Sequence, residues 1–264
     1  MIYTPEQIDQ ITHEKSKVLN RLIDLKMTLT FQFAPTLQSE RAREYLLHGI
    51  CRRLGVLHQS IRNVFEIFPL NREDHLTYVE LSNIEINLHA FTININGLLD
   101  NVAWVFVFEN NLEDNIRGDR RNVGLFSKYV MEHFPDRIKE YLHSDGKKQW
   151  YGNYAKNYRD ALAHRIPPYV PPYTLDPKDA QRYREYDSKI SERMSIGDFD
   201  SIDKLRKEQD SIGSVSGAFL HSYLDHDAAK PVMFHAQMLA DSNTVMEIIR
   251  VVILNKESES HLEL

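Results

Sequence analysis

Apolar residues recur at spacings of three and four along most of this chain, and this helical periodicity constrains the fold more than any other feature. The clearest stretch contains Leu46, Leu47, Ile50, Leu54, Leu57, Ile61 and Val64. Only 10 glycines and 10 prolines occur among 264 residues, and 42% of the residues are hydrophobic. A chain of this kind can bury a substantial core, so we expect a mainly α protein with a single domain over residues 1–264.

Several helix boundaries can be predicted from capping residues. Thr4-Pro5-Glu6-Gln7 is typical of a helix start with a capping box. We expect a second helix from Ser39 to Phe68, and the longest from Arg72, after Asn71, to about Glu109. Alternation at 92–96 and β-forming residues at 105–108 leave a strand open within the longest one.

Polar residues inside this longest stretch have two interpretations. Asn87, Asn94 and Asn101 fall among apolar residues, where amides are more often hydrogen-bonded structural groups than ligands. Asp100 is the carboxylate in this stretch that we single out as a candidate functional group.

The C-terminal third differs in composition. Residues 174–212 are rich in both signs of charge and carry only narrow apolar stripes, which predicts a charged helical insertion, such as a hairpin, that serves as a surface element or partner arm. Residues 213–223 favour a short strand. The polar run 240–244 offers several N-cap residues for a final helix.

Composition excludes some classes of protein. The N-terminus has no secretory signal, and the longest apolar run, Val102 to Phe108, is far shorter than the roughly 20 residues of a spanning helix. We therefore expect a cytoplasmic protein without membrane contact. The single cysteine, Cys51, lies in an apolar helical pattern and is expected to be a core residue. The net charge of −6 disfavours a broad nucleic-acid surface, yet residues 137–165 carry seven basic and three acidic side chains.

No metal or cofactor is expected. His221, Asp225, His226, Asp227 and His235 are potential ligands, but their spacing matches no closed zinc pattern. The sequence also has no phosphate-binding glycine loop, dinucleotide fingerprint or nucleophile elbow.

The strongest candidate for chemistry is Arg159-Asp160-x-x-x-His164, followed by Pro167-Pro168. The Arg-to-His spacing alone means little, because Arg53 and His58 repeat it. Asp160 and the proline stop distinguish this copy. Residues five apart on a helix are turned by about 140° from each other. We expect the proline break to unwind the last turn and bring Arg159 and His164 together. A helix C-terminus also favours a protonated imidazole.

This motif resembles the Arg-polar-x-x-x-His motif of the HEPN superfamily, helical domains found in prokaryotic toxins, antiphage systems and RNA-processing nucleases. The resemblance implies a HEPN-like helical bundle that dimerises and acts as a metal-independent endoribonuclease. In such an enzyme the ribose 2′-OH attacks the adjacent phosphate. His164 would then be the general acid or base, and Arg159 would stabilise the phosphate charge. Asp160 would orient one of these two side chains. A toxin of this type would also have a regulatory or antitoxin protein as partner.

Residues beside the motif extend the candidate RNA site. Lys156 and Arg165 could hold phosphates, and Tyr158 and Tyr169 could stack bases, although aromatic side chains at a helix end are more often packing residues. The alternative is a non-catalytic HEPN-like module that binds a protein partner or a nucleotide. In that case Arg159 and Asp160 form a surface pair and His164 caps the helix.

Overall fold

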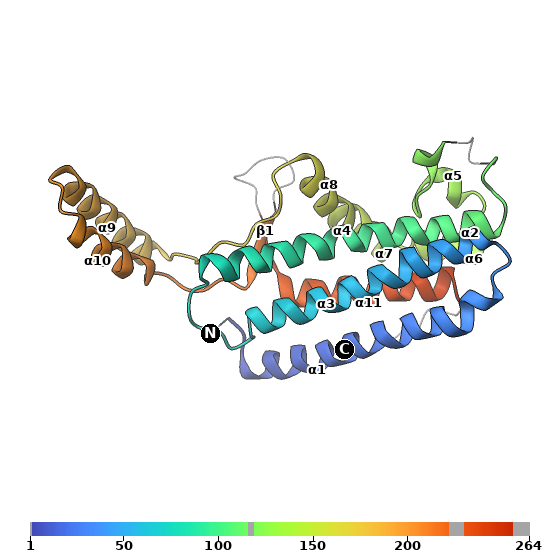
Figure 1. Cartoon of the computed structure of the whole chain (residues 1–264), viewed down its shortest axis with the longest axis horizontal. Helices are drawn as coiled ribbons and strands as arrows, with labels where there is room; N and C mark the ends of the chain where they lie inside the picture. The colour runs from blue at the N-terminus through green and yellow to red at the C-terminus, as the bar shows by residue number, and fades with distance from the viewer. Residues whose placement is uncertain (1, 116–118, 222–229, 256–264) are drawn as a thin grey trace.

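Four long helices form the body of the protein, and the mainly α prediction is confirmed. The computed structural model describes residues 2–115, 119–221 and 230–255. The bundle consists of α1 (Pro5–Met27), α3 (Cys51–Ile67), α4 (Tyr78–Glu109) and α11 (Phe234–Val252). α1 and α4 each contact both α3 and α11, so the four helices enclose one core (Figure 1).

The N-terminal boundaries follow from side-chain caps. The Thr4 side chain accepts a hydrogen bond from the Gln7 backbone, and the Gln7 side-chain oxygen accepts one from the Thr4 backbone, as predicted for the first helix. α4 begins at Tyr78, so the prediction of a start at Arg72 is wrong. Thr77 and Glu80 form the capping box there. Arg72 instead donates from two nitrogens to the Glu80 carboxylate. It also donates to three backbone carbonyls and thereby fixes residues 68–77 as a loop.

In the described part of the chain, three helices contain π-helical turns. The first helix continues through η1 (Thr28–Phe33) and η2 (Ala34–Thr36). The helix predicted from Ser39 is α2 (Glu40–Glu44), η3 (Tyr45–Ile50) and α3. The aromatic helix is α7 (Asp145–Trp150), η5 (Tyr151–Ala155) and α8 (Lys156–His164). Such turns frequently occur near functional sites.

α4 is helical throughout, so the strand alternatives at 92–96 and 105–108 are excluded. It is long and apolar enough to cross a membrane by length and composition, but 56% of its apolar window is buried in the bundle. η4 (Arg120–Asn122), α5 (Lys128–Met131) and α6 (Asp136–His143) follow α4 as short elements.

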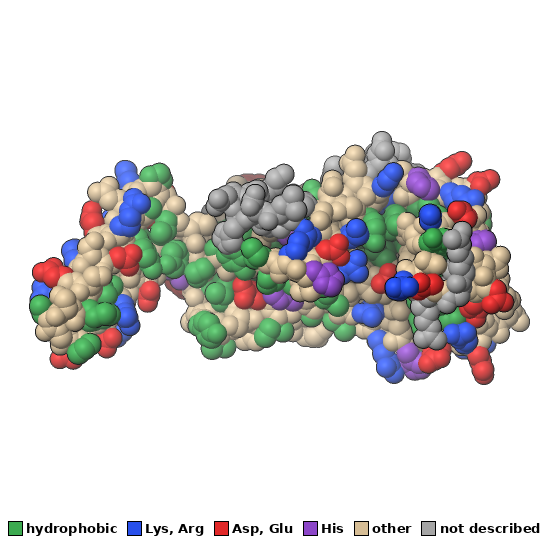
Figure 2. Space-filling view, turned by 90° about the horizontal axis from the view of Figure 1, so that it is seen from above, with side chains coloured by type: hydrophobic (Ala, Val, Ile, Leu, Met, Phe, Trp, Pro, Cys, Tyr) green, Lys and Arg blue, Asp and Glu red, His purple; other side chains and the backbone are tan. Residues whose placement is uncertain are grey.

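The charged segment is a helical hairpin, as predicted. α9 (Pro177–Ser195) and α10 (Phe199–Asp210) pack on each other and project beyond one end of the bundle as an arm (Figure 1). Lys and Arg atoms are interspersed with Asp and Glu atoms along it (Figure 2). At its base, Thr174 pairs with Ser214, and the His75 ring nitrogens lie 2.7 and 3.1 Å from the carbonyl oxygens of Asp210 and Gly213.

A two-stranded antiparallel sheet leads into the last helix. β1 (Ala218–His221) pairs with β2 (Lys230–Met233), so the strand expected within 213–223 is present. α11 starts directly after β2, at Phe234, and the prediction that it is capped within 240–244 is wrong. Phe234 and His235 in the first turn are already buried, and Ser242 and Thr244 donate to carbonyls one turn back instead of capping. Asp225, His226 and Asp227 lie outside the described residues.

Candidate functional site

α8 packs against α4 through one side and leaves the candidate motif on its outer side. Tyr158 and Ala161 are buried, whereas Arg159 and Asp160 are half-buried and His164 is exposed. The helix is regular as far as His164 and ends at Arg165, which is extended at φ −133° and ψ −158°. The expected unwinding before His164 is therefore wrong, because the Arg165 amide still donates to the Ala161 carbonyl. Within one chain, Arg159 and His164 stay about 140° apart around the helix axis.

Asp160 is the direct partner of Arg159. Its Oδ1 lies 2.7 Å from Arg159 Nε, and its Oδ2 lies 3.9 Å from Lys156 Nζ. The Arg159 and Asp160 side chains are 37% and 30% exposed, so both can still reach a bound molecule. The structure thus joins three of the predicted residues, with Asp160 between two cations.

Asp100 of α4 belongs to the same cluster. Surrounding residues partly exclude water from its carboxyl, which raises its pKa although part of the residue is exposed. The positive charges of Arg159 and Arg53 act in the opposite direction and lower this pKa. Tyr151 of η5 lies within reach of the same charges, and burial followed by Asp100 raises the pKa of its hydroxyl. The sequence singled out Asp100 alone and did not show that the charges of an α3 arginine and an α8 arginine both act on it.

The flanking residues have different roles. Lys156 is exposed, and Arg165 donates to Asn157 at the helix end. Tyr169 pairs through its backbone with Leu220 in β1. Tyr158 is 3% exposed and packs edge-on against the rings of Phe219 and His221 in β1. The prediction that it stacks a base is therefore wrong.

Two further side chains with reactive groups, Cys51 and His235, are core residues. Cys51 is buried, and burial raises the pKa of its thiol. The His235 ring lies between the Tyr3 hydroxyl at 3.2 Å and the Phe68 carbonyl at 2.9 Å. Burial lowers the pKa of His235 to about 4, which leaves the ring neutral, with Nε2 as donor and Nδ1 as acceptor. Over residues 2–115, 119–221 and 230–255, no three His, Cys, Asp or Glu side chains are grouped as metal ligands.

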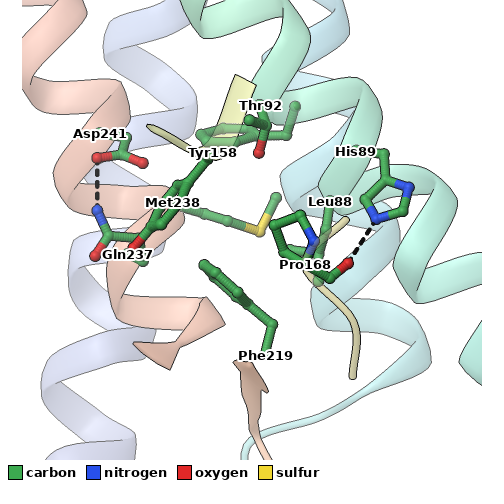
Figure 3. Close-up of a pocket in the computed structure, with 10 residues that line it drawn as sticks. Leu88, His89, Thr92, Tyr158, Pro168, Phe219, Gln237, Met238 and Asp241 are labelled. Carbon is green, nitrogen blue, oxygen red and sulfur yellow. Dashed lines mark hydrogen bonds between the residues drawn. The ribbon is translucent and has the colours of Figure 1, made fainter. Parts of the chain in front are cut away.

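A small cavity lies behind α8, and a buried carboxyl borders it (Figure 3). Its walls come from α4, α8, β1 and α11: Leu88, Phe91, Tyr158, Phe219, Met238 and Asp241. Asp241 Oδ1 accepts hydrogen bonds of 2.7 Å from Trp150 Nε1 and from Gln237 Nε2. Burial raises the pKa of Asp241 to about 6. The cavity has a volume of about 20 Å³, enough for one water molecule.

The α3–α4 seam holds the amides that the sequence singled out, together with a partner, Arg53, that it did not. Arg53 donates from Nε to Asn101 Oδ1 and from Nη1 to Asn94 Oδ1, both at 2.9 Å. Asn87 likewise bonds Asn63. The three amides of α4 are hydrogen-bonded, as predicted. Their seven-residue spacing was the signal that one face of α4 is polar and meets a polar partner.

Comparison of the chain with protein-family models, with curated proteins and with solved structures finds no match.

Proposed function

We propose that this protein is a metal-independent endoribonuclease whose active residues are Arg159, Asp160 and His164. The observation that carries the proposal is the placement of this motif on the outer side of α8, where Asp160 holds Arg159 and His164 is open to solvent. Both signs of charge gather on the face seen in Figure 2. Cleavage by the ribose 2′-OH needs a proton carrier and a cation, and these side chains can supply both.

In the proposed reaction, the 2′-oxygen bonds to the adjacent phosphorus and the bond from phosphorus to the 5′-oxygen breaks. One product ends in a 2′,3′-cyclic phosphate and the other in a 5′-hydroxyl. His164 transfers a proton from the 2′-hydroxyl to the departing 5′-oxygen, and Arg159 stabilises the extra negative charge on the phosphate oxygens. Because these two side chains diverge on one α8, the proposal requires a homodimer in which each site takes Arg159 from one protomer and His164 from its partner.

A non-catalytic module that binds a protein or a nucleotide is the second candidate. It is favoured by the carboxylates around Arg159, since Asp160 pairs with it directly and Asp100 lies nearby. Two carboxylates offset much of the positive charge that a phosphate would require.

The test uses purified protein and end-labelled RNA in the presence of a chelator. The wild type should release fragments ending in 2′,3′-cyclic phosphate, and His164→Ala should abolish the cleavage. His143→Ala is a matched control, because His143 is another exposed histidine at a helix end. Cleavage that persists in His164→Ala, or no cleavage by the wild type, rejects the enzyme and leaves the binding module.

Mixed dimers test the shared site. Arg159→Ala and His164→Ala are each expected to be inactive alone. After the two proteins are mixed and allowed to exchange subunits, half of the dimers should be mixed and each should hold one intact site. Activity should then return to roughly a quarter of the wild-type value. A mixture that stays inactive despite proven exchange contradicts a site shared between protomers.

A further inference from the structure

A polar groove runs along the seam between η3–α3 and α4. Its lining includes Tyr45, His48, Arg52, Arg53, Asn94 and Asn101. The groove has a volume of about 470 Å³, within the range of small-ligand sites. Among the residues that the structure describes, Arg52 and Arg53 outweigh Glu44, the one carboxylate in the lining, so the groove favours an anion.

Arg53 is fixed in this groove by neutral partners. Its two hydrogen bonds, to the side-chain oxygens of Asn94 and Asn101, use two of the five N–H groups of a guanidinium. Amide oxygens orient the group without offsetting its charge, unlike the carboxylate that pairs with Arg159. A guanidinium held in this way can donate its remaining N–H groups to a phosphate.

Two glycines make this arrangement possible. A Cβ atom at Gly97 would lie 2.3 Å from Arg53 Cζ, and one at Gly49 would lie 2.8 Å from Asn101 Cγ. Glycine is a poor residue for a helix interior, yet both positions lie inside helices at the groove. The absence of these side chains lets the guanidinium lie flat on α4.

The groove also has an aromatic side. Tyr45 lines it and is half-buried, with its ring 5.7 Å from Trp104 and 5.1 Å from Phe108 between ring centres. A supported aromatic ring beside arginines is typical of surfaces that bind single-stranded nucleic acids, where bases stack and phosphates meet cations.

We propose that this groove binds single-stranded RNA, with Arg53 bound to a backbone phosphate and Tyr45 stacked on a base. The choice of RNA rests on the proposed function, and the groove gives that RNA a path to α8. Asn101 lines the groove, and the charges of Arg53 and Arg159 both act on Asp100, the preceding residue of α4, so the groove lies near the candidate motif.

Binding is measured separately from cleavage in a His164→Ala background, by fluorescence anisotropy of a short labelled single-stranded RNA over a range of salt concentrations. Arg52→Ala and Arg53→Gln should each weaken binding and reduce the slope of log affinity against log salt by about one. Arg184→Ala on the arm is the matched control, since its side chain is exposed and far from the groove, and it should change neither quantity.

Gly97→Ala tests the geometry at constant charge. The added methyl group displaces the Arg53 guanidinium, so binding should weaken about tenfold while the salt dependence shows the charge still present. Gly55→Ala is its control, because a Cβ there meets only Lys26 Nζ at 3.7 Å. Circular dichroism checks that all variants are folded.

The outcomes separate the two proposals. Groove variants that bind RNA like the parent overturn the groove inference, even if the wild type cleaves RNA. Groove variants that lose binding while the wild type fails to cleave support the groove and reject the nuclease. Binding of polyglutamate in preference to RNA, with the same dependence on Arg53, would assign the groove to an acidic protein and overturn the RNA assignment.

Discussion

Asp241→Asn should stabilise this protein at neutral pH and have no effect in acid. The carboxyl is 5% exposed inside α11, and burial is the largest cause of its raised pKa. A rise from the ordinary value of 3.8 to about 6 corresponds to about 3 kcal/mol of interaction that disfavours the charged form in the folded protein. Asparagine keeps an oxygen that can accept from Trp150 and Gln237, and it cannot ionise.

The sign follows from proton binding. Between about pH 4 and pH 6 the unfolded chain has released this proton while the folded protein still holds it. The free energy of unfolding contributed by Asp241 therefore falls as the pH rises through this window. Below it both states are protonated, and above it the full cost of about 3 kcal/mol is present.

Urea unfolding of wild type and Asp241→Asn at several values between pH 4 and pH 7 measures this effect as a difference, which cancels most other titrating groups. The variant should gain up to about 3 kcal/mol relative to wild type as the pH rises. Asp203→Asn, at an exposed position of the arm, should show no such trend. A difference that is constant with pH, or a variant less stable than wild type at pH 7, would refute the reasoning.

Two further predictions concern His235 in the core and His75 at the base of the arm. Tyr3→Phe removes the donor to His235 Nδ1 and should lower the free energy of unfolding by about 1–3 kcal/mol; an unchanged urea midpoint would contradict it. His75→Ala removes both ring contacts to the arm base, so amide hydrogen exchange should rise in the C-terminal turn of α10 and not in α4. Equal exchange in both proteins would show that His75 does not fix the arm.

Periodicity predicted the helices well because burial of an apolar face decides where a helix can form. The apolar spacing of Leu46–Val64 and the narrow apolar stripes of the charged segment both predicted helices that the structure contains. Boundaries failed where the deciding contact was not local. Asn71 looked like a cap, but Arg72 donates to the carbonyl of Ile67 before it and to the carbonyls of Asp74 and His75 after it. α11 begins without a side-chain cap because it follows β2 directly and its first residues are buried in the core.

The candidate site was only partly readable for the same reason. The sequence shows Arg159, Asp160 and His164 as neighbours, and the Arg159–Asp160 pair forms. It does not show that the charges of Arg53 and Arg159 both act on Asp100, because that proximity depends on helix packing. Tyr158 was misread since its position on α8 relative to Ala161 places it on the buried side. The groove was missed because its shape depends on missing Cβ atoms.

The pairing of Thr174 with Ser214 bears on how the arm could have been acquired. Its two ends lie side by side, joined by backbone hydrogen bonds of 2.8 and 2.9 Å. Segments whose ends meet in this way can be gained or lost as a unit, since a short turn closes the gap without moving the remainder. The bundle and the arm can therefore change at different rates in evolution, and relatives that carry only a tight turn at this position would still form the same four-helix core.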